Sequence, residues 1–180
     1  MGLFRDFLDD LKATRLSPAS IASKLLTGQG TVQTVAIARL SMACWRSPVT
    51  RPFAHLLHRA NVVLNSVDIH PSAEIGGGFV LVHGLGTVIG GETRIGRKVT
   101  IYQNVTLGAR NRFVDGRQMP SIGENTMVFA GACILGPIDV GARCHIGANA
   151  VVLKDVPDFS VAAGVPAKIV PRRDPTDPAV

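Results

Sequence analysis

One feature of the sequence limits its possible folds more than any other. From residue 67 onward, an aliphatic residue recurs every six positions, often with a glycine directly after it. The column consists of Ile69, Ile75 and Leu81, then Ile89, Ile95, Ile101 and Leu107, then Ile122, Val128, Ile134, Val140, Ile146 and Val152. Neither the 3.6-residue period of a helix nor the two-residue period of a strand produces such a column.

A repeat of six residues suits a triangular coil in which three short strands make one turn of about 18 residues. Successive turns would rise by the spacing between paired strands, about 4.8 Å, so that identical positions stack. Columns of Ile and Val then form the core. A narrow core has no room for rings, which agrees with the aromatic content of 5%. We therefore predict a mainly β fold, a parallel β-helix a little over four turns high.

Residues 1–66 lack the repeat, and we predict that they form an N-terminal α-helical segment. Residues 31–46 and 51–67 have apolar periodicity of helical length. We expect two or three helices that pack on the first coils or on a neighbouring subunit. His55 and His58 lie among leucines on the second of these segments, so we expect them to serve helix packing or to face solvent.

Composition excludes several classes of protein. The net charge is +6, but no basic run is interleaved with aromatic residues, so we expect no nucleic-acid partner. No apolar run reaches the roughly 20 residues of a membrane span. The acidic, amphipathic N-terminus is unlike a secretory signal, and the three cysteines, Cys44, Cys133 and Cys144, lack metal-like spacing. We expect a cytoplasmic protein with buried, reduced thiols.

The six-residue register breaks at two places. Between Leu81 and Ile89 the step is eight, so two extra residues enter the coil beside His83. Residues 109–120 are rich in charged and turn residues, and we predict a protruding loop. Breaks of this kind in a regular sequence concentrate at functional sites. The β-helix is expected to span residues 67–170, with residues 171–180 as a C-terminal tail.

Four motifs within residues 67–170 resemble the hexapeptide-repeat acyltransferases, most closely the serine acetyltransferase branch. They are "DIHP", "HGLG", "TIYQNVTLG" and "AAGVPAKIV". The resemblance implies a left-handed β-helix, an exception to the usual right-handed crossover. It also implies acetyl-coenzyme A as the co-substrate, no metal ion, and a homotrimer with active sites between subunits.

In that family the histidine that matches His83 is the catalytic base, and the aspartate that matches Asp68 is its partner. The two residues are 15 positions apart, a little under one turn, so one is expected to lie about a coil below the other. His83 would then accept the proton of an attacking hydroxyl, while Asp68 holds the imidazole tautomer. Two simpler roles remain open: a buried His83 bonded to backbone, and an Asp68 that caps a turn. His70 is expected to fix local turn structure.

The resemblance also implies where the cofactor binds. The pantetheine arm of coenzyme A offers amides that pair with exposed backbone along the edge of the coil, and small residues allow it to approach closely. A lysine near the end of the repeat suits the cofactor's phosphates. The matching positions are Gly108, Ala109, Ala130, Gly131, Gly164, Pro166 and Lys168.

The chain departs from the serine-specific pattern at three places in the sequence, which involve four residues. Val82 replaces the aspartate before the catalytic histidine, and Gly91 stands in the place of a glutamate. Gln118 and Met119 replace an Arg-His pair before proline. A zwitterionic amino acid needs an acid for its ammonium and a cation for its carboxylate, and an unpaired charge in a site costs about 1 to 3 kcal/mol or more.

These departures favour an acceptor other than serine. We expect an O-acetyltransferase that acts on a sugar, a polysaccharide precursor or another small hydroxyl compound, with Glu92, Arg117 and Met119 as acceptor-binding candidates. Serine O-acetyltransferase in cysteine synthesis is the alternative, in which Arg110, Arg112 or Arg117 of the loop substitutes for the missing groups. A non-catalytic scaffold or a metal-bearing carbonic anhydrase-like domain is a third class, but the spacing of His70, His83 and His145 does not fit that metal site.

Overall fold

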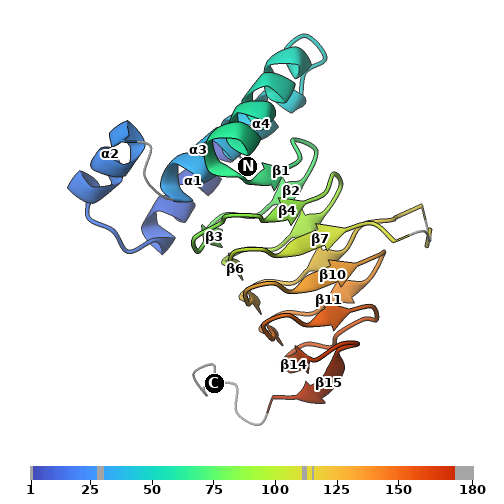
Figure 1. Ribbon diagram of the computed structural model, residues 1–180. Coiled ribbons are helices and arrows are strands. Elements are labelled where there is room, and N and C mark those ends of the chain that lie inside the picture. The colour runs from blue at the N-terminus through green and yellow to red at the C-terminus, as the bar shows by residue number, and fades with distance from the viewer. Residues whose placement is uncertain (1, 28–30, 111–112, 115, 173–180) are drawn as a thin grey trace.

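The computed structural model describes residues 2–27, 31–110, 113–114 and 116–172, and places helices ahead of a three-sided coil of short strands (Figure 1). The described part of the chain contains four helices, α1 (Leu3–Ala13), α2 (Pro18–Thr27), α3 (Thr31–Trp45) and α4 (Arg51–Asn65). The predicted helical segment followed by a parallel β-helix is confirmed. The expected number of two or three helices is wrong, because α1 and α2, at 11 and 10 residues, are shorter than the 15-residue helices α3 and α4 that the sequence predicted.

The strands are mostly two or three residues long and form three sheets, one on each side of the prism. The first sheet, called sheet A here, contains β1 (Asp68–Ile69), β4 (Val88–Ile89), β7 (Thr106–Gly108), β10 (Cys133–Leu135) and β13 (Val151–Val152). Sheet B contains β2 (Glu74–Ile75), β5 (Arg94–Ile95), β8 (Ser121–Ile122) and β11 (Asp139–Val140). Sheet C contains β3 (Val80–Leu81), β6 (Thr100–Ile101), β9 (Met127–Val128), β12 (His145–Ile146), β14 (Ser160–Ala163) and β15 (Lys168–Pro171). Only β15 pairs antiparallel among these strands; it closes the C-terminal end of the coil.

Strand pairing in sheet A reproduces the repeat and its two breaks. Ile69 lies beside Ile89, Ile89 beside Leu107, Leu107 beside Ile134, and Ile134 beside Val152. The second and fourth steps span the expected 18 residues. The first step contains two extra residues, the insertion at His83, and the third contains the nine extra residues of the loop. Both insertions are therefore accommodated at corners without shifting the register of the core.

The core is the stacked aliphatic column. All thirteen of its residues are buried, and Ile89, Ile101, Leu107, Val128, Ile134 and Ile146 have no exposed surface at all. Burying each such side chain contributes about 1.5 to 3 kcal/mol. Glycines after the column allow adjacent coils to approach: a Cβ at Gly123 would lie 2.4 Å from the backbone carbon of Gly141.

The cysteines only partly match the expectation of buried thiols. Cys144 is buried, and burial raises the pKa of its thiol. Cys44 and Cys133 are half-buried. Cys133 is half-buried because it occupies the outward-facing position of β10. All three are free thiols.

The helical segment is attached to the first coil by a buried ion pair. Arg39 of α3 donates to both carboxylate oxygens of Asp10 of α1, at 2.8 and 3.0 Å, and to the backbone oxygens of Ile75 and Gly76. Asp10 in turn accepts the N–H of Phe79. Burial raises the pKa of Asp10, although the Arg39 guanidinium opposes this effect. One pair of side chains therefore joins α1, α3 and the start of the β-helix.

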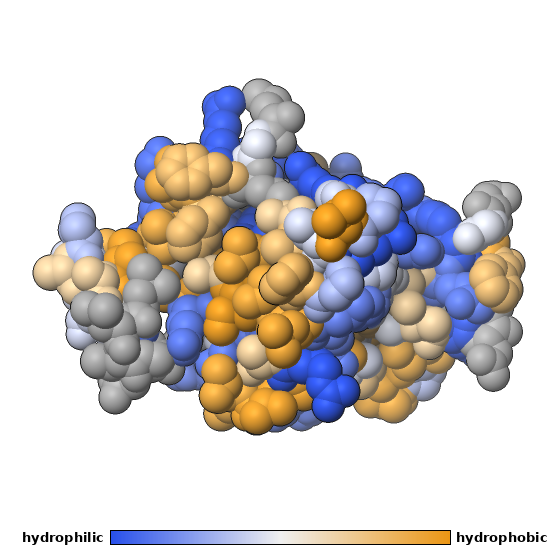
Figure 2. Space-filling model, turned by 90° about the horizontal axis from the view of Figure 1, so that it is seen from above, coloured by the Kyte–Doolittle hydropathy of each residue, from blue (hydrophilic) through white to orange (hydrophobic). Residues whose placement is uncertain are grey.

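Apolar side chains remain exposed on the helical end of the molecule. Figure 2 looks onto this end and shows hydrophobic residues gathered between polar regions. The exposed apolar residues of α4 include Phe53, Leu56, Val63 and Leu64. None of the described helices has the length and apolarity needed to cross a bilayer.

The buried pair generates a stability prediction. Arg39→Met is expected to lower the free energy of unfolding by about 3 to 5 kcal/mol, because it leaves the Asp10 carboxylate buried without its cation. Arg97→Met is the matched control. Arg97 also links α1 to the β-helix, 2.7 Å from Asp9, but both side chains are partly exposed, so its loss should destabilise the fold much less. Urea unfolding followed by circular dichroism measures both, and equal losses would contradict the assigned role of the buried pair.

Candidate functional site

The corner that joins β3 to β4 carries the exposed side chain of His83. Its backbone has a positive φ of 61°, and Gly84 and Gly86 are also left-handed, at 63° and 70°. Glycine adopts this conformation without strain. The Gly86 N–H donates to the oxygen of Ser66, 2.8 Å away, so the insertion lies directly against the chain segment that enters β1. The break in the repeat thus projects an imidazole from the surface of the prism.

Asp68 begins β1 beside this corner. Its N–H donates to the oxygen of Thr87 at 2.9 Å, which ties it to the end of the insertion. Among the described residues no hydrogen bond or ion pair joins Asp68 to His83; the Asp68 carboxylate instead accepts from His58 Nε2 of α4 at 2.7 Å. The expectation that His58 serves only packing or faces solvent is therefore wrong. No sequence pattern links residues 58 and 68, because the contact depends on the chain reversal at Ser66, which caps α4 in the left-handed region.

A cluster of rings supports His58. His58 packs edge-on against His70, with 5.7 Å between ring centroids, and His70 packs against Trp45 at 5.4 Å. The Ser72 N–H donates to His70 Nδ1 at 3.1 Å, and Ser72 Oγ lies 2.7 Å from the same nitrogen. His70 therefore fixes the local turn, as predicted. Burial, and then the nearby His58, lower the pKa of His70, so it is neutral near pH 7.

The acceptor-binding candidates lie at the other end of β4. Glu92 is exposed in the turn between β4 and β5, with a positive φ of 64°. Met119 reaches the same corner: a Cβ on Gly90 would lie 2.9 Å from Met119 Cε. A Cβ on Gly91 would lie 2.7 Å from Ser72 Oγ. His83 precedes β4 and these residues follow it, so within one chain they occupy opposite edges of sheet A.

Arg117 is held on the outer face of sheet B. It donates to both carboxylate oxygens of Asp139, at 2.8 and 3.0 Å, and to Ser121 Oγ. This pairing lowers the pKa of Asp139. The described residues of the predicted loop 109–120 extend outward from the coil between β7 and β8 (Figure 1). Arg110 is exposed at its base, whereas Arg112 lies outside the described residues.

The cofactor-binding candidates lie along the coil rather than in one pocket. Gly108 is the last residue of β7 and Ala109 follows it, and Ala130 and Gly131 form the turn between β9 and β10. Gly164 and Pro166 lie in the hairpin turn between β14 and β15, and Lys168 begins β15. The Gly164 oxygen accepts the N–H of Val151, so this hairpin lies against β13. Gly164, Pro166 and Lys168 are exposed, and the other candidates, except exposed Ala109, are half-buried.

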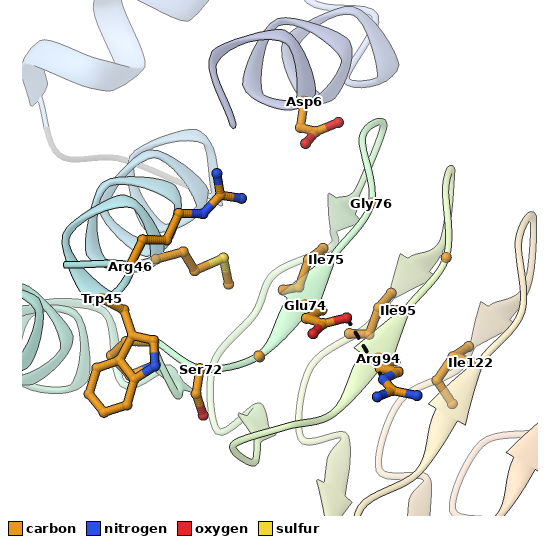
Figure 3. A pocket seen from close by; sticks show the side chains of 14 residues that line it. Asp6, Trp45, Arg46, Ser72, Glu74, Ile75, Gly76, Arg94, Ile95 and Ile122 are labelled. Carbon is orange, nitrogen blue, oxygen red and sulfur yellow. Dashed lines mark ion pairs between the residues drawn. The ribbon is translucent and has the colours of Figure 1, made fainter. Parts of the chain in front are cut away.

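A groove of about 730 Å³ lies elsewhere, between the helices and sheet B (Figure 3). Trp45, Arg46, Ser72, Glu74 and Arg94 line it, with Asp6 above them. Neither His83 nor Asp68 lines this groove. The described residues contain no cluster of three or more His, Cys, Asp or Glu side chains arranged to hold a metal ion.

Comparison with known proteins identifies the family. The bacterial transferase hexapeptide family (six repeats) matches residues 119–154. A serine acetyltransferase of Staphylococcus xylosus is 44% identical over 117 residues, which cover 65% of this chain and 54% of the relative. A serine acetyltransferase solved in complex with CoA has a TM-score of 0.80 and 36% identity, covering 93% of this chain and 69% of that chain. A soybean serine acetyltransferase complexed with serine has a TM-score of 0.82 and 37% identity, with the same coverage.

These comparisons correct the expected acceptor and show how much of its relatives the chain spans. The expected sugar or polysaccharide acceptor is wrong, because the similar proteins in sequence and in structure are serine acetyltransferases. The departures at Val82, Gly91 and Met119 misled the prediction because they were treated as the loss of an amino-acid site. The chain spans about half the length of the curated relatives it matches. Within these limits, the chain belongs to the serine acetyltransferase family of hexapeptide-repeat transferases.

Proposed function

We propose that this chain is a serine O-acetyltransferase that transfers the acetyl group of acetyl-coenzyme A to the hydroxyl of serine. The observation that carries the proposal is an exposed histidine on an insertion that interrupts an otherwise regular coil, beside a carboxylate, in a chain 44% identical to a serine acetyltransferase. Family structures in complex with CoA and with serine support both substrates.

The chemistry follows from the two side chains at the insertion. His83 accepts the serine hydroxyl proton as the oxygen attacks the thioester carbonyl, and a tetrahedral intermediate forms. The carbon–sulfur bond then breaks, and the imidazolium returns the proton to the leaving thiolate. Asp68 orients the imidazole and stabilises its charged form. The thioester is already activated, so no covalent intermediate on the protein is required.

A homotrimer would complete the site. His83 lies before β4, and Glu92 and Met119 lie after it, so one chain offers the base at one edge and the acceptor-binding candidates at the other. The outer face of sheet B is charged, with Glu74, Arg94 and Asp139. The outer faces of sheets A and C carry mostly uncharged side chains, namely Val88, Thr106, Cys133 and Val151, and Val80, Thr100, Met127, His145 and Val161. Packing these two faces between subunits would place the His83 corner, which joins sheet C to sheet A, at the contact between neighbouring chains.

Serine recognition must then come from charges at shifted positions. Glu92 directly follows Gly91, the position where the family has its glutamate, and its exposed carboxylate suits the serine ammonium. Exposed Arg110, at the base of the loop, offers a cation for the serine carboxylate. Two charges supplied from loop and turn positions replace the groups that the motif lacks.

The activity prediction concerns His83. Wild-type protein given acetyl-coenzyme A and serine should release free thiol and form O-acetylserine. His83→Ala should lower kcat by about 10² to 10⁴, the usual contribution of a general base. Light scattering checks that both proteins have about three times the chain mass of 19.0 kDa. Thiol release that persists in His83→Ala would remove the base assignment, and no transfer to serine by wild type would remove the proposed function.

A second prediction concerns the cofactor end of the coil. Lys168→Gln should raise KM for acetyl-coenzyme A about threefold to tenfold without changing kcat, because the exposed ammonium binds phosphate equally in the ground and transition states. The difference should shrink at high salt. Lys98→Gln, which removes an exposed cation from the corner between β5 and β6, is the control. An equal rise of KM in both variants would mean that the net charge of the protein, and not the position of Lys168, determines the affinity for acetyl-coenzyme A.

A further inference from the structure

His58 is the one histidine of the helical segment that contacts the proposed catalytic pair. Its Nε2 lies 2.7 Å from Asp68 Oδ1, the side chain of His58 is 18% exposed, and that of Asp68 is 47% exposed. An ionised carboxylate only accepts hydrogen bonds, so His58 Nε2 carries the proton and donates it. The family resemblance assigns no role to this position.

The helix that carries His58 is fixed against α3 on both sides of it. Ser41 Oγ donates to the oxygen of Ala54 at 2.9 Å, and Asn61 Nδ2 donates to the oxygen of Thr34 at 3.3 Å. Ala54 and Asn61 are buried, and each is one helical turn from His58. The rotation of α4 is therefore set, and it turns the imidazole toward β1.

The ring of His58 is also held from the side. His70 packs edge-on against it, and the hydrogen bond from the Ser72 N–H keeps His70 Nδ1 unprotonated. His70 therefore packs against His58 as a neutral ring. A donor placed by a helix and a neutral ring placed by a turn together restrict where the carboxylate can point.

We propose that His58 is a positioning residue: it holds Oδ1 of Asp68 so that Oδ2 is directed to the imidazole of His83 in the assembled enzyme. The insertion that carries His83 lies within reach, because Gly86 and Thr87 bond to Ser66 and Asp68. A carboxylate bonded through both oxygens orients its partner better than one free to rotate. This inference rests on the proposed function, since it assigns His58 to the same acetyl transfer.

Kinetics of three variants test the role. His58→Leu removes the donor and should lower kcat about tenfold to 100-fold, as expected when a catalytic group loses its alignment, while KM for serine and for acetyl-coenzyme A changes less than twofold. His58→Gln places an amide N–H near the position of Nε2 and should recover most of the loss. His55→Gln is the matched control, one turn earlier on α4 and in contact with Trp45 rather than Asp68, and should keep kcat within twofold.

A double variant with Asp68 distinguishes a positioning role of His58 from a general loss of structure. In an Asp68→Asn background, His58→Leu should cause less than a twofold further loss of kcat, because the group that it positions is already changed. A full additional loss in the double variant, an unchanged or raised kcat in His58→Leu, or no rescue by His58→Gln would overturn the proposal.

A measurement without substrate distinguishes this inference from the proposed function. The chain has five histidines, so imidazole ¹³C labelling of the intact protein gives five signals that single substitutions assign. Asp68→Asn should move the His58 signal and leave that of His145, on distant β12, in place. A stationary His58 signal would overturn the contact, whatever the acceptor. A His58 signal that moves in a protein inactive with serine would instead reject only the proposed function.

Discussion

The structure depends on one constraint: every sixth residue must be a small aliphatic side chain that points into a narrow prism. Parallel pairing then fixes each coil on the one before it, and identical positions stack from Ile69 to Val152. A core of this kind cannot absorb an extra residue, because one shift would turn polar positions inward along the whole column. Extra residues are tolerated only at corners, and the corners are therefore where chemistry can be added.

The two insertions illustrate this division. The insertion of two residues displays His83 on left-handed backbone, and the insertion of nine residues forms the projecting loop. They lie at opposite edges of sheet A, and the strands between them are only two or three residues long. The rigid strand β4 therefore sets the separation of His83 from Glu92 and Met119.

Sequence reasoning predicted the features that depend on local order and missed those that depend on packing. The register, the bulge at His83 and the turn role of His70 depend on neighbours within a few residues or on a strict period, and the structure agrees with them. The Arg39–Asp10 pair and the His58–Asp68 bond join segments that meet only through chain reversal and helix packing. The periodicity of the sequence does not predict contacts between such distant segments. The acceptor was misjudged for a related reason, because charge can be supplied from Glu92 or Arg110 without matching the family's own positions.

The bond between His58 and Asp68 shows that the helical segment does more than cover the first coil. If the helices only filled space beside the first coil, a buried apolar contact would be sufficient. Instead α4 is pinned to α3 by buried polar bonds, and its partly buried histidine is directed at the one carboxylate next to the insertion. Buried polar bonds cost more to misplace than apolar contacts, so they specify a single orientation. The ion pair of Arg39 with Asp10 fixes the same helices to the first coil. The helical segment thus adds a side-chain anchor for the Asp68 carboxylate to the backbone pairing that already holds β1 on the coil.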